Sequence, residues 1–167
     1  MFRRRFLLAF SCVALCASLA SAQDKQSPDV WLTVTGEVTH PLKLTAADFA
    51  KLPHQKLTTK DTDGKPVTFE GVALVELLQA AGVGFGEKLR GKNLELFLVV
   101  EAADGYKAVF ALPELDPAFN DRTIILAETR DGKPLAEAEG HWRVIVPDEK
   151  RHGRWVRKVI SLTVRRA

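Results

Sequence analysis

Alternating and β-branched apolar positions predict a chain built mainly of short strands. Asp-Gly pairs at 63–64, 104–105 and 131–132 predict tight turns between neighbouring strands. Strands and helices follow one another without a regular strand–helix–strand alternation, so the pattern favours a mixed, mostly β, α+β fold with a few short helices. The expected strands cover residues 30–36, 56–62, 66–69, 94–102, 106–112, 123–129, 141–147 and 159–165.

Two segments have the pattern of short helices. Residues 45–52 begin with a capping-box pattern, Thr45 followed by Asp48, and Pro53 ends the helix. Residues 74–81 carry apolar side chains at helical spacing, which predicts a helix with one buried stripe. That stripe consists of Leu74, Leu77, Leu78 and Ala81.

Side-chain patterns in three strands predict which residues face the core. In the 141–147 strand, we expect His141 and Arg143 on the face opposite Trp142. The 94–102 strand is almost continuously apolar, so we expect both of its faces to be covered. In the last strand, the residues expected to point inward are Ile160, Leu162 and Val164.

Residues 1–22 have the pattern of a secretory signal peptide. Arg3–Arg5 form a cationic start, an apolar stretch follows, and residues 20–22 provide an A-x-A cleavage site, so the mature chain is expected to begin at Gln23. The apolar stretch is shorter than the roughly 20 residues that span a bilayer. A retained amino-terminal anchor is the alternative, and the arginines also fit a loose twin-arginine export pattern.

The rest of the chain has the organisation of one exported domain. Residues 23–29 are polar and are expected to form a flexible start, and residues 30–167 are expected to form a single domain. Because a cleaved signal peptide directs export, we expect the mature protein in the periplasm, with no membrane association after cleavage.

Charge and composition exclude two classes of protein. The chain has 24 Lys+Arg and 21 Asp+Glu, a net charge of +3. The leader holds three of these cations and no acid, so the remaining 145 residues carry 21 charges of each sign. That balance excludes a generally basic nucleic-acid binder. A hydrophobic content of 46% excludes a disordered acidic chain.

Thiol chemistry is not expected in the mature chain. Cys12 and Cys16 both lie in the leader, so cleavage leaves no thiol for a disulfide, a metal site or catalysis. The four histidines lack metal-motif spacing, and no nucleophile elbow, P-loop or dinucleotide fingerprint occurs. A cationic carboxyl-terminal region can hold an anion. Its cations are Lys150, Arg151, Arg154, Arg157, Lys158, Arg165 and Arg166.

Five segments in order resemble the oxidoreductase molybdopterin-binding domain family, which has the fold of sulfite oxidase. The first is an aromatic-x-Gly-Val motif at Phe69 that runs into the 74–81 helix. Each motif alone is weak, but together they span nearly the whole chain after the leader. The five segments are residues 69–82, 103–106, 125–135, 140–147 and 153–159.

The resemblance implies a cofactor site that this chain retains only in part. In the family's enzymes, a cysteine thiolate before the aromatic-x-Gly-Val motif binds molybdenum beside a pterin dithiolene. The corresponding residues 54–67 contain no cysteine. Arg143 and Arg157 retain cationic positions of the family that help to hold the pterin, and we expect them to flank a cleft near Tyr106. The departures are Lys158, where the family has Trp, and Trp142, where it has Leu.

Two main hypotheses follow. Molybdenum in this family needs a soft protein ligand, so we favour an exported non-catalytic binding or sensory module that holds a pterin or another small anion, without thiolate-bound molybdenum. The alternative is a molybdopterin-dependent oxidoreductase of the sulfite oxidase type, with His54 in place of the thiolate. A purely structural periplasmic protein is a third interpretation. The cofactor-binding candidates are Arg143, Arg157, Tyr106 and His141, and none is assigned a catalytic or metal-ligand role.

Overall fold

The strands of the domain form two sheets that pack against each other. The computed structural model describes residues 31–167, so the expected signal peptide and flexible start lie outside the described residues. The first sheet has the order β2-β1-β10-β5-β6, and its strands are antiparallel except for the parallel pair β1 and β10. These strands are β1 (Trp31–Gly36), β2 (Leu42–Thr45), β5 (Leu96–Ala102), β6 (Lys107–Ala111) and β10 (Val159–Arg166).

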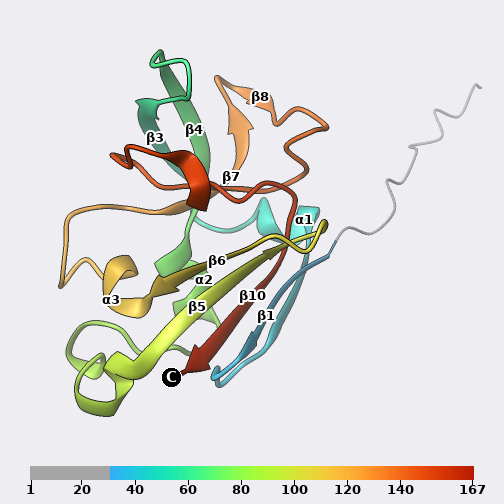
Figure 1. The fold of residues 1–167 in the computed structure, drawn as a ribbon. Coiled ribbons are helices and arrows are strands. Elements are labelled where there is room, and N and C mark those ends of the chain that lie inside the picture. The colour runs from blue at the N-terminus through green and yellow to red at the C-terminus, as the bar shows by residue number, and fades with distance from the viewer. Residues whose placement is uncertain (1–30) are drawn as a thin grey trace, which may run out of the picture.

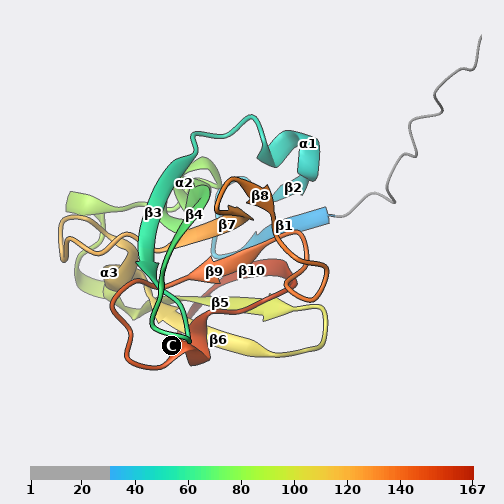
Figure 2. The same ribbon diagram turned by 90° about the horizontal axis from the view of Figure 1, so that it is seen from above.

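The second sheet is antiparallel and carries most of the residues discussed below. Its order is β3-β4-β7-β8, and β9 also pairs with β7. Figures 1 and 2 show the hairpin of β3 and β4 rising from the body of the molecule, with the red-orange segment that follows β9 beside it. The strands are β3 (Gln55–Lys60), β4 (Pro66–Ala73), β7 (Ile125–Arg130), β8 (Lys133–Pro134) and β9 (Arg143–Ile145).

The helices are short, as the sequence predicts, and the mostly β, α+β fold class is confirmed. No helix in residues 31–167 is both long and apolar enough to cross a membrane. The α-helices are α1 (Ala46–Phe49), α2 (Leu74–Ala80) and α3 (Leu112–Leu115). The 3₁₀ turns are η1 (Gly86–Lys88), η2 (Gly91–Glu95) and η3 (His152–Arg154).

Both predicted helices form, although the first ends earlier than expected. The capping box of α1 is present, because Thr45 Oγ1 accepts from the Asp48 backbone N–H at 3.1 Å and the Asp48 carboxylate accepts from the Thr45 N–H at 3.2 Å. The helix stops at Phe49, before the predicted end at residue 52, and turns follow it. The apolar stripe of α2 is fully buried, as its spacing predicts.

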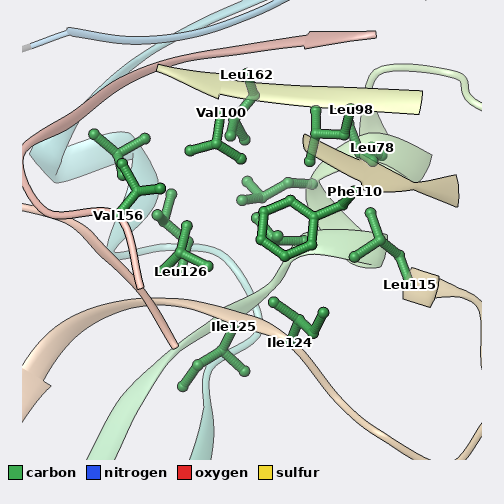
Figure 3. Packing of buried hydrophobic residues seen from close by; sticks show 14 of the residues in the cluster. Leu78, Leu98, Val100, Phe110, Leu115, Ile124, Ile125, Leu126, Val156 and Leu162 are labelled. Carbon is green, nitrogen blue, oxygen red and sulfur yellow. The ribbon is translucent and has the colours of Figure 1, made fainter. Parts of the chain in front are cut away.

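The hydrophobic core lies between the two sheets. Figure 3 shows Leu98, Val100 and Leu162 of the first sheet facing Leu126 of the second, with Ile125 on the other face of β7 but in the same buried cluster. All five are fully buried. The same cluster receives the buried stripe of α2, so the helix closes one side of the core.

The alternation expected in the 141–147 strand is wrong. The strand β9 covers only three residues, and Arg143, Val144 and Ile145 are all buried. One edge of β9 pairs with β7, and on the other the Val144 N–H donates to the Val156 carbonyl at 2.8 Å. Because other parts of the protein surround β9, the side chains on both of its faces are buried, and the alternation of residue types does not separate core from solvent positions.

Two other strand predictions need correction. Ile160 is 40% exposed, whereas its neighbour Val159 is buried, because a register shift in the β10–β5 pairing between Val159 and Ser161 turns Ile160 outward. The 94–102 strand begins only at Leu96, since Leu94 lies in η2 and is exposed.

The glycine of the aromatic-x-Gly-Val motif is required by strand packing. A Cβ added to Gly71 would lie 2.1 Å from the carbonyl oxygen of Leu126 and 2.5 Å from the Cα of Ala127. Both are backbone atoms of the neighbouring region of β7, which pairs with β4 at this point through a register shift between Glu70 and Gly71. Any side chain here would therefore push two central strands apart.

We expect Gly71→Ala to reduce the free energy of unfolding by about 3 kcal/mol, because backbone cannot move aside as a flexible side chain does. Chemical denaturation monitored by tryptophan fluorescence measures the change. The control is Gly153→Ala, whose added Cβ would have no heavy atom within 4 Å. It should change stability by less than about 0.5 kcal/mol. Equal stability of the two variants would contradict the packing argument.

Candidate functional site

Charged side chains gather in a cavity of about 370 Å³ at one end of the second sheet. We refer to it as the charged cavity. Asp61 enters it directly after β3, Arg130 from the end of β7, and Arg143 from the start of β9. The segment after β9 supplies His152, Trp155 and Arg157. The full lining is Asp61, Thr62, Arg130, Glu139, Arg143, His152, Trp155 and Arg157.

A tight turn fixes Asp61 in the charged cavity. The Asp61 N–H donates to the Lys65 carbonyl at 3.0 Å, and the Gly64 N–H donates to the Asp61 carbonyl at 2.8 Å. The Thr62 N–H donates to the Asp61 carboxylate at 2.7 Å. The side chain is only 8% exposed, although it follows an edge strand of the sheet. The turn therefore holds an ionised group inside the protein.

Two arginines compensate the charge of Asp61. Arg130 Nη2 lies 2.7 Å from Asp61 Oδ2, and Arg143 Nη2 lies 4.0 Å from Asp61 Oδ1. Arg143 also donates from Nη1 to the buried carboxylate of Glu139. The other oxygen of Glu139 accepts from the Ala136 N–H at 3.3 Å, so the backbone orients this carboxylate too. The result is an ion-pair network, not a set of free cations.

Arg143 is buried among aromatic rings. It is only 7% exposed, and its Cζ lies 5.6 Å from the centre of the Phe69 ring and 5.2 Å from that of Trp155. His152 stacks on Trp155 with ring centres 3.8 Å apart. Two buried nitrogens, Arg143 Nε and His152 Nδ1, have no hydrogen-bond partner in the described residues.

The surroundings of Asp61 change its pKa. Burial raises the pKa of the carboxyl, but the Thr62 N–H and the charges of Arg130 and Arg143 outweigh burial and hold it below the usual value. The folded protein therefore favours the ionised form of Asp61 more than the unfolded chain does.

Arg157 lies where the charged cavity meets a second hollow of about 300 Å³, which Tyr106 also lines. His152, Trp155 and Arg157 line both. Tyr106 lines only the second hollow, is 52% exposed, and donates its hydroxyl to the Gly153 carbonyl at 2.6 Å. Arg157 is exposed and has no ion pair or hydrogen bond among residues 31–167. The structure thus brings three of the four candidates, Arg143, Arg157 and Tyr106, to one region, where their role as ligand-binding residues stays a prediction.

The fourth candidate, His141, lies elsewhere. It is exposed, outside β9, and lines a separate hollow beside Glu128 and Glu137. The expectation that His141 shares a face with Arg143 is wrong, because Gly140 turns the chain with φ of +78° and regular strand geometry begins only at Arg143. His141 and Arg143 line different hollows among those described.

Arg154 fastens the segment that closes the charged cavity. It donates to Glu149 from Nε and Nη2 and to Glu114 from Nη1 at 2.9 Å, and it lies over the ring of Phe110 at 4.6 Å. Burial lowers the pKa of the guanidinium, but the hydrogen bonds and charges of the two glutamates outweigh it and raise the pKa. Arg154 is thus a structural cation, whereas Arg157 is unpaired within residues 31–167.

The donor atoms of this region do not fit a thiolate-bound molybdenum. No cysteine occurs in residues 31–167, and these residues contain no group of three His, Cys, Asp or Glu side chains placed to hold a metal ion. The carboxylate that residues 54–67 contribute, Asp61, is a hard ligand already paired with arginine. His54 lies edge-on to Phe49 and donates from Nδ1 to the Leu52 carbonyl at 2.7 Å, and it lines none of the hollows described.

The sequence patterns do not predict the two carboxylates of the charged cavity, Asp61 and Glu139. Asp61 and Arg130 belong to different hairpins, and no periodicity connects them. Glu139 stands four residues before Arg143, a spacing that also occurs by chance in any charged segment. Nothing in the sequence marks Trp155 as a site residue except its place in the last of the five segments.

The comparisons identify the class of protein. The family model described as oxidoreductase molybdopterin-binding domain matches residues 20–167. The chain therefore belongs to the oxidoreductase molybdopterin-binding domain family, and the resemblance seen in its motifs is confirmed.

A solved structure and the curated proteins give the remaining comparisons. The crystal structure of the sulfane dehydrogenase SoxCD from Paracoccus pantotrophus is similar, with a TM-score of 0.63 and 22% identity over 80% of this chain. At that identity the likeness shows the fold alone. The chain spans 37% of the SoxCD chain that it matches. No curated protein matches this sequence.

The dependence of stability on pH tests whether Asp61 is ionised in the folded protein. Because its pKa is lower in the folded protein, the unfolded chain binds this proton more tightly, so stability falls as pH drops through the usual aspartate pKa, about 3.9. We expect Asp61→Asn to flatten the dependence of the unfolding free energy on pH between about pH 6 and pH 3, measured by denaturation. Asp63→Asn, in the same hairpin and exposed, should keep the wild-type slope. An unchanged slope in Asp61→Asn would refute this assignment.

Proposed function

We propose that this protein is an exported, non-catalytic binding module that uses the molybdopterin-oxidoreductase fold to hold a small anion or a pterin. The signal-peptide pattern of residues 1–22 supports export to the periplasm. Membership of the family supports a pterin-like ligand, since the family is described by molybdopterin binding. The chain keeps the cationic positions Arg143 and Arg157 but supplies no thiolate after the leader.

The observation that carries the proposal is the state of Asp61. It is the one residue of 54–67 whose carboxylate enters the charged cavity, and it is paired with Arg130 at 2.7 Å. A carboxylate engaged in this way is a poor ligand for a metal that the family's enzymes bind through sulfur. The proposal therefore contains no redox step.

The charges of the cavity favour a ligand with a single negative charge. Three guanidinium groups, those of Arg130, Arg143 and Arg157, face the two carboxylates of Asp61 and Glu139, which leaves one positive charge. Among the described residues of the lining, Arg157 is the guanidinium without a partner, and its planar fork suits a carboxylate or another oxyanion. A pterin that bears one carboxylate has matching charge and a planar ring for this mixed aromatic and cationic site.

Elemental analysis tests the non-catalytic assignment. The chain is expressed in a host that makes the molybdenum cofactor, and the exported protein is purified without chelators. We expect a mature amino terminus at Gln23 and no stoichiometric molybdenum, because the thiols leave with residues 1–22. Stoichiometric molybdenum would restore the oxidoreductase hypothesis, and Met1 recovered from a membrane fraction would refute export by cleavage.

Binding of pterin-6-carboxylate tests the role of Arg157. We expect Arg157→Gln to weaken binding about tenfold in a fluorescence titration, because one charge-assisted hydrogen-bonding group is lost. Its unfolding free energy should stay within about 0.5 kcal/mol of the wild type, since the side chain is exposed and unpaired. Arg165→Gln removes the same charge from a position that lines none of the hollows described, and it should leave binding unchanged. Equal loss in both variants would refute a specific site.

A further inference from the structure

The ion-pair network reproduces, within the chain, the charge balance that a bound anion would provide. Arg143 is buried and therefore needs a negative partner, because an unpaired cation in the protein interior is costly. Glu139 accepts a hydrogen bond from Nη1 of this guanidinium, and Asp61 Oδ1 lies 4.0 Å from Nη2. Arg130 takes its partner from the same aspartate.

We propose that Asp61 is a built-in counter-ion that takes the place of a doubly charged anion, such as the phosphate of a cofactor, so that the domain folds without one. The same carboxylate closes the cavity to dianions. This inference rests on one part of the proposed function, namely that the protein carries no thiolate-bound molybdenum. It predicts that the preference of the site for singly charged ligands depends on one residue.

Preorganisation supports this role for Asp61. Its carboxylate accepts from both the N–H and the hydroxyl of Thr62, at 2.7 and 3.3 Å, and the 61–65 turn holds its backbone. A carboxylate fixed in this way is oriented before any ligand arrives. His152 Nδ1, a buried nitrogen without a hydrogen bond, lies 3.9 Å from Asp61 Oδ1.

Removal of the carboxylate should therefore leave a site ready for an oxyanion. In Asp61→Asn, Arg130 loses its 2.7 Å partner and Arg143 keeps only Glu139. The net charge of the cavity lining rises from one positive charge to two, the charge that a sulfate or phosphate dianion would neutralise. The amide that replaces the carboxylate can still accept from Thr62, so the turn itself can persist.

Thermal unfolding with sodium sulfate as the probe tests the inference. We expect Asp61→Asn to have a lower Tm than the wild type and to regain about 3 °C or more in millimolar sulfate. Sodium chloride at matched ionic strength should give no such gain. The wild type and Asp63→Asn, which changes an exposed aspartate of the same hairpin, should respond equally little to both salts.

Two further variants keep the test decisive. Asp61→Glu retains the charge and should gain no sulfate response, whereas Asp61→Asn combined with Arg130→Gln should lose the response that Asp61→Asn alone acquires. If Asp61→Asn does not fold in chloride, sulfate should refold it. A sulfate response equal to that of the wild type, or no refolding by sulfate, would overturn the inference. Neither result concerns molybdenum binding, so these outcomes are distinct from those of the elemental analysis, which tests the proposed function.

Discussion

A guanidinium group buried against two aromatic rings is the interaction on which this end of the molecule depends. Arg143 lies over Phe69 and Trp155, and neither ring can neutralise its charge. Glu139 supplies a full countercharge, and Asp61 adds a second at longer range. The loop before β9, the hairpin of β3 and β4 and the segment after β9 must therefore all be in place together. Loss of the loop or the hairpin would leave Arg143 with one countercharge fewer, and loss of the segment after β9 would remove the ring of Trp155, so folding of this region is cooperative.

The sequence predicts features that depend on local periodicity and misses those that depend on distant contacts. The stripe of α2 and the capping box of α1 follow from spacing alone, so both were predictable. The strands β2 and β8 have only four and two residues, too few to show a pattern. Arg143 and Arg157 were found through motifs, but Asp61 was not, because its partners come from other strands. Alternation failed at β9 since protein surrounds it on every side.

Two glycines in the segments that resemble the family are explained by the packing of the chain, without reference to a cofactor. Gly71 allows β4 to lie against the backbone of β7. Gly140 has φ of +78°, and a Cβ there would lie 2.8 Å from the Cα of Lys158, so it permits two chain segments to cross closely. Such positions preserve the scaffold whatever ligand the site takes. The architecture of the family therefore depends in part on glycines that make no contribution to ligand chemistry.

The contact between Arg154 and the outer strand of the first sheet has a consequence for self-association. β6 is the last strand of that sheet, and an outer strand offers unpaired backbone groups to any extended chain that approaches. Arg154 Nη1 reaches the carbonyl oxygen of Val109 in β6 at 3.4 Å, and the hydroxyl of Tyr106 ties the adjoining turn down at Gly153. A strand from a second molecule would meet a charged side chain and a folded turn there. The segment that lines the cavity thus also hinders edge-to-edge pairing at the β6 edge of this sheet.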